Sequence, residues 1–199
     1  EAIPAHWTAS YSGSRGSFAR SLFHILCAIS VGHTSLDRKW VATTAGGDVF
    51  ARDRESLINR ITTLTVVAGL LLTSAAALVT TPPPSPAILD YTARGPCIAL
   101  WASFGILLGG IIVASADLYV LATCDARFMA DVLMATRARV VCSLTLLAYP
   151  FFSIGGGALL SVCALLVAAW NSPDPVIRVG CVFLFAVPVT MLLVFVAAA

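Results

Sequence analysis

Charged side chains are absent from four long stretches of the chain, which are residues 61–89, 95–116, 140–173 and 179–199. An α-helix rises about 1.5 Å per residue, so roughly 20 apolar residues cross the hydrocarbon core of a bilayer, which is about 30 Å thick. Each stretch is therefore long enough for one crossing. The predicted transmembrane helices comprise about residues 61–80, 96–121, 140–170 and 176–199. The expected fold is an all-α, polytopic membrane protein built as a four-transmembrane-helix bundle.

The third predicted transmembrane helix contains Pro150, followed by three consecutive glycines at 155–157. A proline inside a helix removes a backbone hydrogen bond, and its ring clashes with the preceding turn, so it bends the helix. We expect Pro150 to kink the third helix and Pro188 to kink the fourth. The carbonyl freed at Pro150 gives a second interpretation, in which it lines a cavity or binds a cation.

Residues 1–60 are predicted to form a partly helical cytoplasmic segment that precedes the transmembrane domain of residues 61–199. Apolar residues recur at helical spacing in residues 21–31, which are too few to cross a bilayer. This helix either lies in the membrane interface, with Arg15 and Arg20 near the lipid headgroups, or packs against the transmembrane bundle.

The rest of this segment is predicted from its small and polar residues. Residues 1–20 are rich in Ser, Ala and Gly and are expected to be a flexible lead-in, and residues 32–47 are expected to be a loop. Asp48 is a candidate N-cap for a helical entry at residues 49–60 that continues into the first transmembrane helix. Because the sequence starts at Glu1 and ends in an apolar stretch, we expect the natural chain to extend beyond both ends.

Basic residues are distributed unevenly between the two sides that four crossings would create. The segment before the first crossing holds seven of the 12 Lys and Arg residues, and the second connection holds Arg127, Arg137 and Arg139. The first and third connections hold one each, Arg94 and Arg178. Cytoplasmic loops of membrane proteins carry an excess of Lys and Arg, so both termini are predicted to be cytoplasmic.

Small residues recur at four-residue spacing on the predicted transmembrane helices. They let helix backbones approach closely, which is how helices associate where no hydrophobic force acts between them. The candidate helix-packing positions are Gly69, Thr73, Ala77, Gly105, Gly109, Gly110, Ala114, Gly157 and Ser161. They are expected to pack the bundle internally, and the alternative is that they form an interface between subunits.

Asp117 is the only acidic residue inside a predicted transmembrane helix. An ionisable side chain in a membrane span is costly and is usually paired or functional. Counting about 20 residues from the outer end of the second helix places Asp117 near the inner boundary of the bilayer. We expect it to form a structural ion pair with Arg137 or Arg139. The alternative is an ion or proton gate at the cytoplasmic mouth.

Sequence motifs of enzymes and of metal sites are missing. The three histidines all precede the predicted transmembrane helices, and no cysteine or histidine cluster has the spacing of a zinc site. Gly-x-Ser-x-Gly and Walker-type loops are also absent. We therefore expect no enzyme activity, no metal and no cofactor. The six cysteines are expected to be small apolar packing residues, the alternative being a disulfide from Cys97 to Cys163 or Cys181.

The charge content is typical of a membrane protein. Charged residues make up 11% of the chain, against about 25% in soluble proteins. The formal net charge of +2 is small, which argues against a nucleic-acid partner. The expected partners are the lipid bilayer and either further copies of this chain or another membrane protein.

Families with four spans have features that can be compared with this sequence. Tetraspanins have a large cysteine-rich second outer loop, and claudins have a cysteine pair in a long first outer loop; neither feature is present. The layout resembles that of the Orai calcium channels, with a basic entry to the first span, a proline-bearing outer loop and a second span that carries small residues. The resemblance is topological only, because an Orai pore needs acidic residues in the first span, and this span has none. No family is assigned.

These features favour a structural or assembly subunit that acts through close helix packing, as an oligomer. The low charge within the spans and the small-residue positions support this function. An alternative is an oligomeric channel or transporter subunit that uses Asp117, the Pro150 region and the hydroxyl groups of the first span. A membrane enzyme ranks third, because the spans show no layer of converging polar residues.

Overall fold

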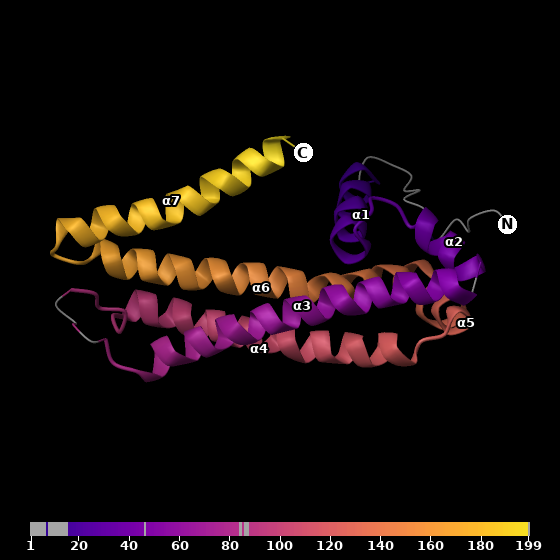
Figure 1. The fold of residues 1–199 in the computed structure, drawn as a ribbon, viewed down its shortest axis with the longest axis horizontal. Helices are drawn as coiled ribbons and strands as arrows, with labels where there is room; N and C mark the ends of the chain where they lie inside the picture. Colours follow the sequence, from indigo (N-terminus) through magenta and orange to yellow (C-terminus); the bar gives the residue numbers. More distant parts are fainter. Residues whose placement is uncertain (1–6, 8–15, 46, 84, 86–87, 199) are drawn as a thin grey trace. The chain divides into compact units, whose positions relative to one another are not determined.

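The computed structural model describes residues 7, 16–45, 47–83, 85 and 88–198 (Figure 1). These residues form helices joined by turns and irregular connections, and they contain no strand. The elements are α1 (Gly16–Val31), α2 (Asp37–Ala45), α3 (Gly47–Thr80), α4 (Arg94–Thr123), α5 (Ala126–Phe128), the π-helix η2 (Met129–Leu133), α6 (Arg137–Trp170) and α7 (Pro175–Ala198). The predicted all-α fold class is therefore confirmed for the described residues.

Three of these helices, α3, α4 and α6, are long and apolar enough to cross a membrane. They have 34, 30 and 34 residues, and the most apolar stretch of each has a mean hydropathy between 2.0 and 2.3. Only 17% to 28% of the residues in these stretches are buried, so most apolar side chains point outward. Helices that are apolar on all sides and exposed in this way are typical of a membrane-embedded protein.

The three helices contain the first three predicted spans and extend beyond them. α3 includes the predicted helical entry at residues 49–60 without interruption, and it ends at Thr80, two residues before the first proline of the run, Pro82. Proline cannot continue a helix, which explains this end. The start of α7 at Pro175 also follows from its sequence, because the Asp174 carboxylate accepts a 2.9 Å hydrogen bond from the Val176 N–H. Aspartate before a proline is a favourable helix start.

The loop predicted for residues 32–47 is wrong, because most of it forms helix α2. Gly32 adopts a φ of 82° after the last residue of α1, and glycine ends helices in this conformation at no steric cost. In α2 the buried residues are Lys39, Ala42 and Thr43, and their i, i+3, i+4 spacing puts them on one helix face. Burial of this face holds the segment as a helix although its sequence is polar.

Residues 1–20, predicted as a flexible lead-in, are described only in part. Trp7 is 2% exposed, and its ring packs edge-on against Trp40, with centroids 5.1 Å apart and planes at 73°. Residues 16–20 belong to α1. The flexible lead-in is therefore wrong at these positions, and the rest of it lies outside the described residues.

The chain divides into two compact units, and the boundary between them falls inside α3, α4 and α6. The first unit comprises residues 1–68 and 109–153, and the second comprises residues 69–108 and 154–199. The domain division predicted at residue 60 separates a cytoplasmic segment from the transmembrane domain. It concerns position relative to the membrane and not compactness, so it stays a prediction.

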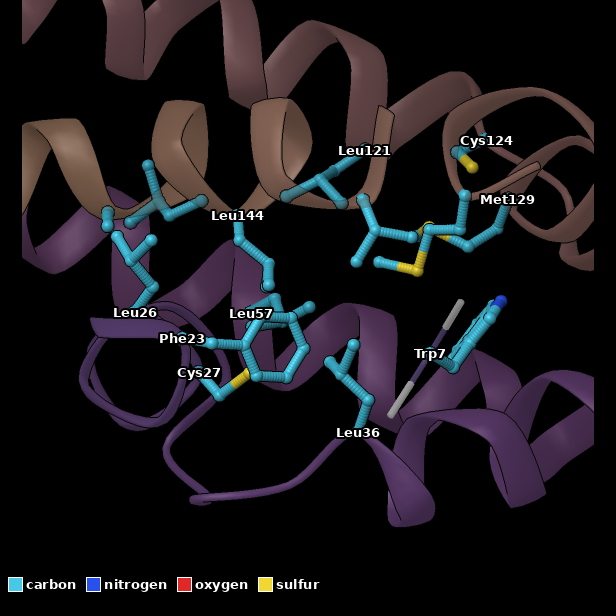
Figure 2. Packing of buried hydrophobic residues seen from close by; sticks show 14 of the residues in the cluster. Trp7, Phe23, Leu26, Cys27, Leu36, Leu57, Leu121, Cys124, Met129 and Leu144 are labelled. Atoms are coloured by element: carbon cyan, nitrogen blue, oxygen red, sulfur yellow. The ribbon is translucent and has the colours of Figure 1, made fainter. Parts of the chain in front are cut away.

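The hydrophobic core of the first unit joins α1 to segments far along the chain. α1 contributes Phe23, Leu26 and Cys27, which are all buried. Figure 2 shows them in one cluster with Leu57 of α3 and Leu144 of α6. Contacts over such sequence separations fix the position of α1 within its own unit.

The helix predicted for residues 21–31 lies within α1, and its two sides differ. One side is packed into the core of the first unit, whereas Arg20, Leu22 and Ile25 are exposed. Packing against other helices of the unit is therefore observed. An interfacial position of the exposed side at a membrane surface stays a prediction.

The second unit has a smaller core of Tyr91, Leu100, Ala164 and Ala168. The Tyr91 hydroxyl donates a 3.2 Å hydrogen bond to the Thr81 carbonyl, which ties the connection before α4 to the end of α3. α7 belongs to this unit, and most of its described residues are exposed. The unit therefore leaves much apolar surface uncovered by its own chain.

Candidate functional site

α4 and α6 approach each other closely in the first unit at Gly110. A Cβ atom at this position would lie 2.9 Å from the Cβ of Ser153 and would also collide with its hydroxyl oxygen. Such contacts are too short for a packed interior, so glycine is required here. Gly109 has a looser contact, in which an added Cβ would lie 3.2 Å from the Tyr149 hydroxyl. Ala114, a third predicted packing position on α4, is buried in the core of this unit.

In the second unit, α4 and α6 approach at Gly157. A Cβ atom added there would lie 2.6 Å from Cγ of Leu107, which is fully buried. The Ser103 hydroxyl donates a 2.6 Å hydrogen bond to the Gly157 carbonyl, and its oxygen lies 2.7 Å from the Ser161 hydroxyl. Interhelical hydrogen bonds of this kind stabilise helix pairs in lipid. Gly157 and Ser161 therefore take part in helix packing within the chain.

The remaining predicted packing positions have no such contact. A Cβ added to Gly69 or to Gly105 meets no atom within 4 Å. Thr73 and Ala77 are exposed, and the Thr73 hydroxyl donates a 2.8 Å hydrogen bond to the Leu70 carbonyl of its own helix. We call Gly69, Thr73 and Ala77 the small-residue face of α3.

Asp117 lines a cavity of about 100 Å³ in the first unit, which we call the Asp117 cavity. The residue is 8% exposed, and its Oδ2 atom is buried without a hydrogen-bond partner. The other polar lining residues are Lys39 and Ser143. The apolar lining includes Leu121, Met129, Leu133, Met134, Leu144 and Leu147, and Figure 2 shows Leu121, Met129 and Leu144 within the core of this unit. The cavity thus has a largely hydrocarbon wall and borders one buried acidic side chain.

The ion pair predicted between Asp117 and Arg137 or Arg139 has no support among the described residues. Nη1 of Arg139 instead donates a 3.1 Å hydrogen bond to the Val132 carbonyl. Arg137 is the first residue of α6. The structural pair and the gate both stay predictions, and what the structure adds is the burial of Asp117 beside a cavity.

The sequence does not predict Lys39 as a site residue. Lys39 is 2% exposed, and its Nζ donates a 3.3 Å hydrogen bond to Oδ2 of Asp53, so the two form an ion pair whose lysine is buried and whose aspartate is partly exposed. Burial lowers the pKa of Lys39, and the Asp53 carboxylate opposes this by favouring the charged ammonium. The signal that points to Lys39 is its helical spacing with Ala42 and Thr43, which is the pattern of a buried face.

All six cysteines are free thiols, so the alternative disulfide at Cys97 is not formed. Burial raises the pKa of the Cys27 thiol to about 12, and burial also raises the pKa of the Cys124 thiol. Thiols with a raised pKa stay protonated at neutral pH and are poor nucleophiles. Both residues pack in the core of the first unit. Among the described residues, no group of three or more His, Cys, Asp or Glu side chains is placed to hold a metal.

Pro150 and Pro188 lie inside α6 and α7, where the sequence predicts kinks. Both helices continue past the proline. The Ser153 hydroxyl donates a 3.0 Å hydrogen bond to the Pro150 carbonyl of the same helix. The carbonyl that loses its backbone donor to the proline is that of Leu146, four residues earlier. The kinks themselves stay predictions.

Two features of the described residues bear on function. Thr73 and Ala77 of the small-residue face of α3 are exposed, and the Asp117 cavity borders an acidic side chain whose Oδ2 has no hydrogen-bond partner. Comparison of the chain with known protein families, with curated proteins and with solved structures gives no match.

Proposed function

We propose that the chain is an integral membrane assembly subunit that self-associates through the small-residue face of α3. The observation that supports this is the four-residue spacing of Gly69, Thr73 and Ala77 on a part of α3 that its own chain leaves open. Within the part of the chain that the structure describes, no atom lies within 4 Å of a Cβ added to Gly69. A helix from another molecule can therefore approach the α3 backbone there.

The chain already uses small residues for close helix contact. Gly110 and Gly157 allow α4 and α6 to approach within each unit. Lipid tails are as apolar as leucine, so helices in a bilayer associate through close packing rather than through removal of apolar surface from water. A second copy is the partner that we favour, because it presents the same face and a two-fold interface is self-complementary. Another membrane protein with small residues on one helix is the alternative partner.

Replacing Ala77 by leucine is expected to weaken self-association of the protein in liposomes. The larger side chain would hold the two α3 helices apart, and such overpacking costs about 1–3 kcal/mol. This cost corresponds to roughly fivefold to 150-fold in the association constant. Gly69→Leu should act in the same direction. Energy transfer between differently labelled copies, followed as lipid is added, measures the association.

Ala186→Leu is the matched control for this experiment. It adds the same side chain at an exposed position of α7 that lies outside the small-residue face, so it should keep the wild-type association. The proposal is contradicted if wild-type copies transfer energy only at the level of random encounter. It is also contradicted if the control loses as much association as Ala77→Leu.

We further propose that α7 is a fourth transmembrane helix and that both termini are cytoplasmic. α7 has 24 residues, which is enough to cross a bilayer. Its exposed apolar side chains include Phe183, Leu184 and Val187, as expected for a helix in contact with lipid. The distribution of Lys and Arg along the sequence supports the orientation.

Single cysteines introduced at exposed positions test this topology, in a background whose six native cysteines are replaced by serine. Ser85→Cys and Asp174→Cys should react with a membrane-impermeant maleimide in intact cells. Asp125→Cys and Ala197→Cys should react only after the membrane is permeabilised. External labelling of Ala197→Cys would show that α7 does not cross, and external labelling of Asp125→Cys would reverse the orientation.

An oligomeric channel or transporter subunit is the alternative function. The observation that favours it is Asp117, an ionisable side chain held in largely apolar surroundings. Both functions need self-association, so a protein that stays monomeric in lipid contradicts both. Ion or solute flux through liposomes that contain the oligomer separates the alternative from the assembly function.

A further inference from the structure

We propose that the Asp117 cavity binds a small organic cation of the alkylammonium class. In this complex the ammonium group pairs with the negative charge of the Asp117 carboxylate, and the alkyl chain lies against the apolar wall. All lining residues belong to the first unit of one chain. The inference therefore goes beyond the assembly function and does not depend on self-association.

The unpaired carboxylate is the first argument for this ligand. Asp117 is more than nine-tenths buried, and its Oδ2 accepts no hydrogen bond from any residue that the structure describes. A buried polar atom without a partner is costly, and the cost is greatest for a charged group. A cation in the adjoining cavity offsets the cost of the buried negative charge, and charge-assisted hydrogen bonds are roughly twice as strong as neutral ones.

The composition of the wall is the second argument, because it distinguishes organic cations from metal ions. Hard cations such as sodium and calcium bind several oxygen ligands at once. Ca²⁺, for example, binds about six to eight oxygen atoms. Besides Asp117, the lining offers one hydroxyl, that of Ser143, which already donates a 3.1 Å hydrogen bond to the Leu133 carbonyl. Leucine and methionine side chains form most of the remaining surface. Such a wall suits the hydrocarbon part of an organic ligand.

Lys39 also lines the cavity, so its positive charge has to be considered. Its ammonium lies 3.3 Å from Oδ2 of Asp53, which balances the lysine charge within the pair. Asp117 has no corresponding partner among the described residues. The charges of Lys39 and Asp53 balance each other, so the negative charge of the Asp117 carboxylate stays uncompensated. A monovalent cation in the cavity neutralises this charge.

The size of the cavity limits the length of the alkyl chain. Its volume is about 100 Å³, whereas an engineered apolar cavity of about 150 Å³ takes up benzene. A ligand with about four carbon atoms therefore fits, and n-butylammonium is a suitable probe. Its neutral counterpart n-butanol has a similar length and can donate a hydrogen bond, but it has no charge.

Isothermal titration calorimetry of the full chain in lipid nanodiscs tests the site, with protein-free nanodiscs subtracted to remove partitioning into lipid. We expect saturable binding of one n-butylammonium per chain. Binding of n-butanol should be at least about tenfold weaker, because it makes only a neutral hydrogen bond. Equal binding of the two probes, or no saturable binding of n-butylammonium, would overturn the proposal.

Two variants locate the binding site at Asp117. Asp117→Asn keeps the shape and removes the charge, so it should weaken n-butylammonium binding at least about tenfold and leave n-butanol binding unchanged. Asp131→Asn is the matched control, because Asp131 is exposed and does not line the cavity. Unchanged n-butylammonium binding by Asp117→Asn, or an equal loss in the control, would place the binding elsewhere and overturn the proposal.

A third variant keeps the test decisive if Asp117→Asn fails to fold. Ser143→Leu retains the carboxylate but fills part of the cavity with a larger side chain. It should abolish binding of n-butylammonium and of n-butanol alike, because both occupy the same space. Persistent binding of n-butylammonium by this variant would show that the ligand lies outside the cavity.

Discussion

Asp53→Asn is expected to destabilise the protein by about 3 kcal/mol, which is the low end of the range for breaking a buried ion pair. The substitution leaves the ammonium of Lys39 with 2% exposure and without its carboxylate partner. The side chain of Asp53 is 31% exposed, so water screens part of the interaction and the upper end of the range does not apply. The free energy of unfolding in detergent, measured by denaturant titration, checks this value.

Removal of the lysine should have a much smaller effect than removal of the aspartate. Lys39→Met replaces the buried ammonium by an apolar side chain of similar length, and such replacements are often neutral or stabilising. The double variant Lys39→Met/Asp53→Asn should therefore be more stable than Asp53→Asn alone. If Lys39→Met destabilises the protein as much as Asp53→Asn, the charge of Lys39 contributes favourably and the argument from burial fails.

The same lysine gives the stability a defined dependence on pH. Burial lowers the pKa of Lys39 below its ordinary value of 10.5, so the unfolded chain binds this proton more tightly than the folded chain. The free energy of unfolding therefore rises as the pH rises from the lowered pKa towards 10.5. Wild-type protein should show this rise relative to Lys39→Met, which has no ammonium to titrate.

The long helices are predictable from the sequence because their signal is local. Stretches without charge mark α3, α4 and α6, and the proline run after Thr80 marks the end of the first of them. The helical entry at residues 49–60 is predictable for the same reason, since it continues the α3 pattern. These predictions need no knowledge of which segments meet in space.

α2 and Trp7 are not predictable in this way, because their structure depends on contacts with distant residues. The sequence of α2 is polar, and its helix is held by burial of one face and by the pair between Lys39 and Asp53. Trp7 stands among small and polar residues but packs against Trp40. The sequence around each contact is polar, as it is in a solvated loop, so it does not predict either contact.

The candidate site likewise has a part that the sequence predicts and a part that depends on the fold. The sequence identifies Asp117 as unusual because an acid stands in an apolar helix. Its surroundings depend on Met129 and Met134, which follow α4 and turn back into the core of the first unit. The cavity and the contribution of Lys39 therefore appear only once the chain is folded.

The three glycines at 155–157 show most clearly what a sequence pattern leaves open. All three look equivalent in the sequence, yet a Cβ added to Gly157 collides with Leu107, and one added to Gly155 or Gly156 meets no atom within 4 Å. Gly157→Ala is therefore expected to destabilise the protein by about 1–3 kcal/mol, which is the usual cost of overpacking. The collision involves Cγ of a fully buried leucine, an atom that rotation about χ2 does not move. The free energy of unfolding in detergent measures the effect.

Gly155→Ala is the matched control, because it adds the same methyl group two residues away in the same helix. Alanine is the better helix former, so this variant should be stabilised by about 0.5–1 kcal/mol. The two substitutions thus have opposite signs if α4 and α6 pack as described, since only Gly157 lies at the contact. Leu107→Ala should reduce the cost of Gly157→Ala, because it removes the atoms that the new methyl group meets. Equal effects of Gly155→Ala and Gly157→Ala would show that α4 and α6 do not approach each other at Gly157. The hydrogen bond from the Ser103 hydroxyl to the Gly157 carbonyl would then also be absent.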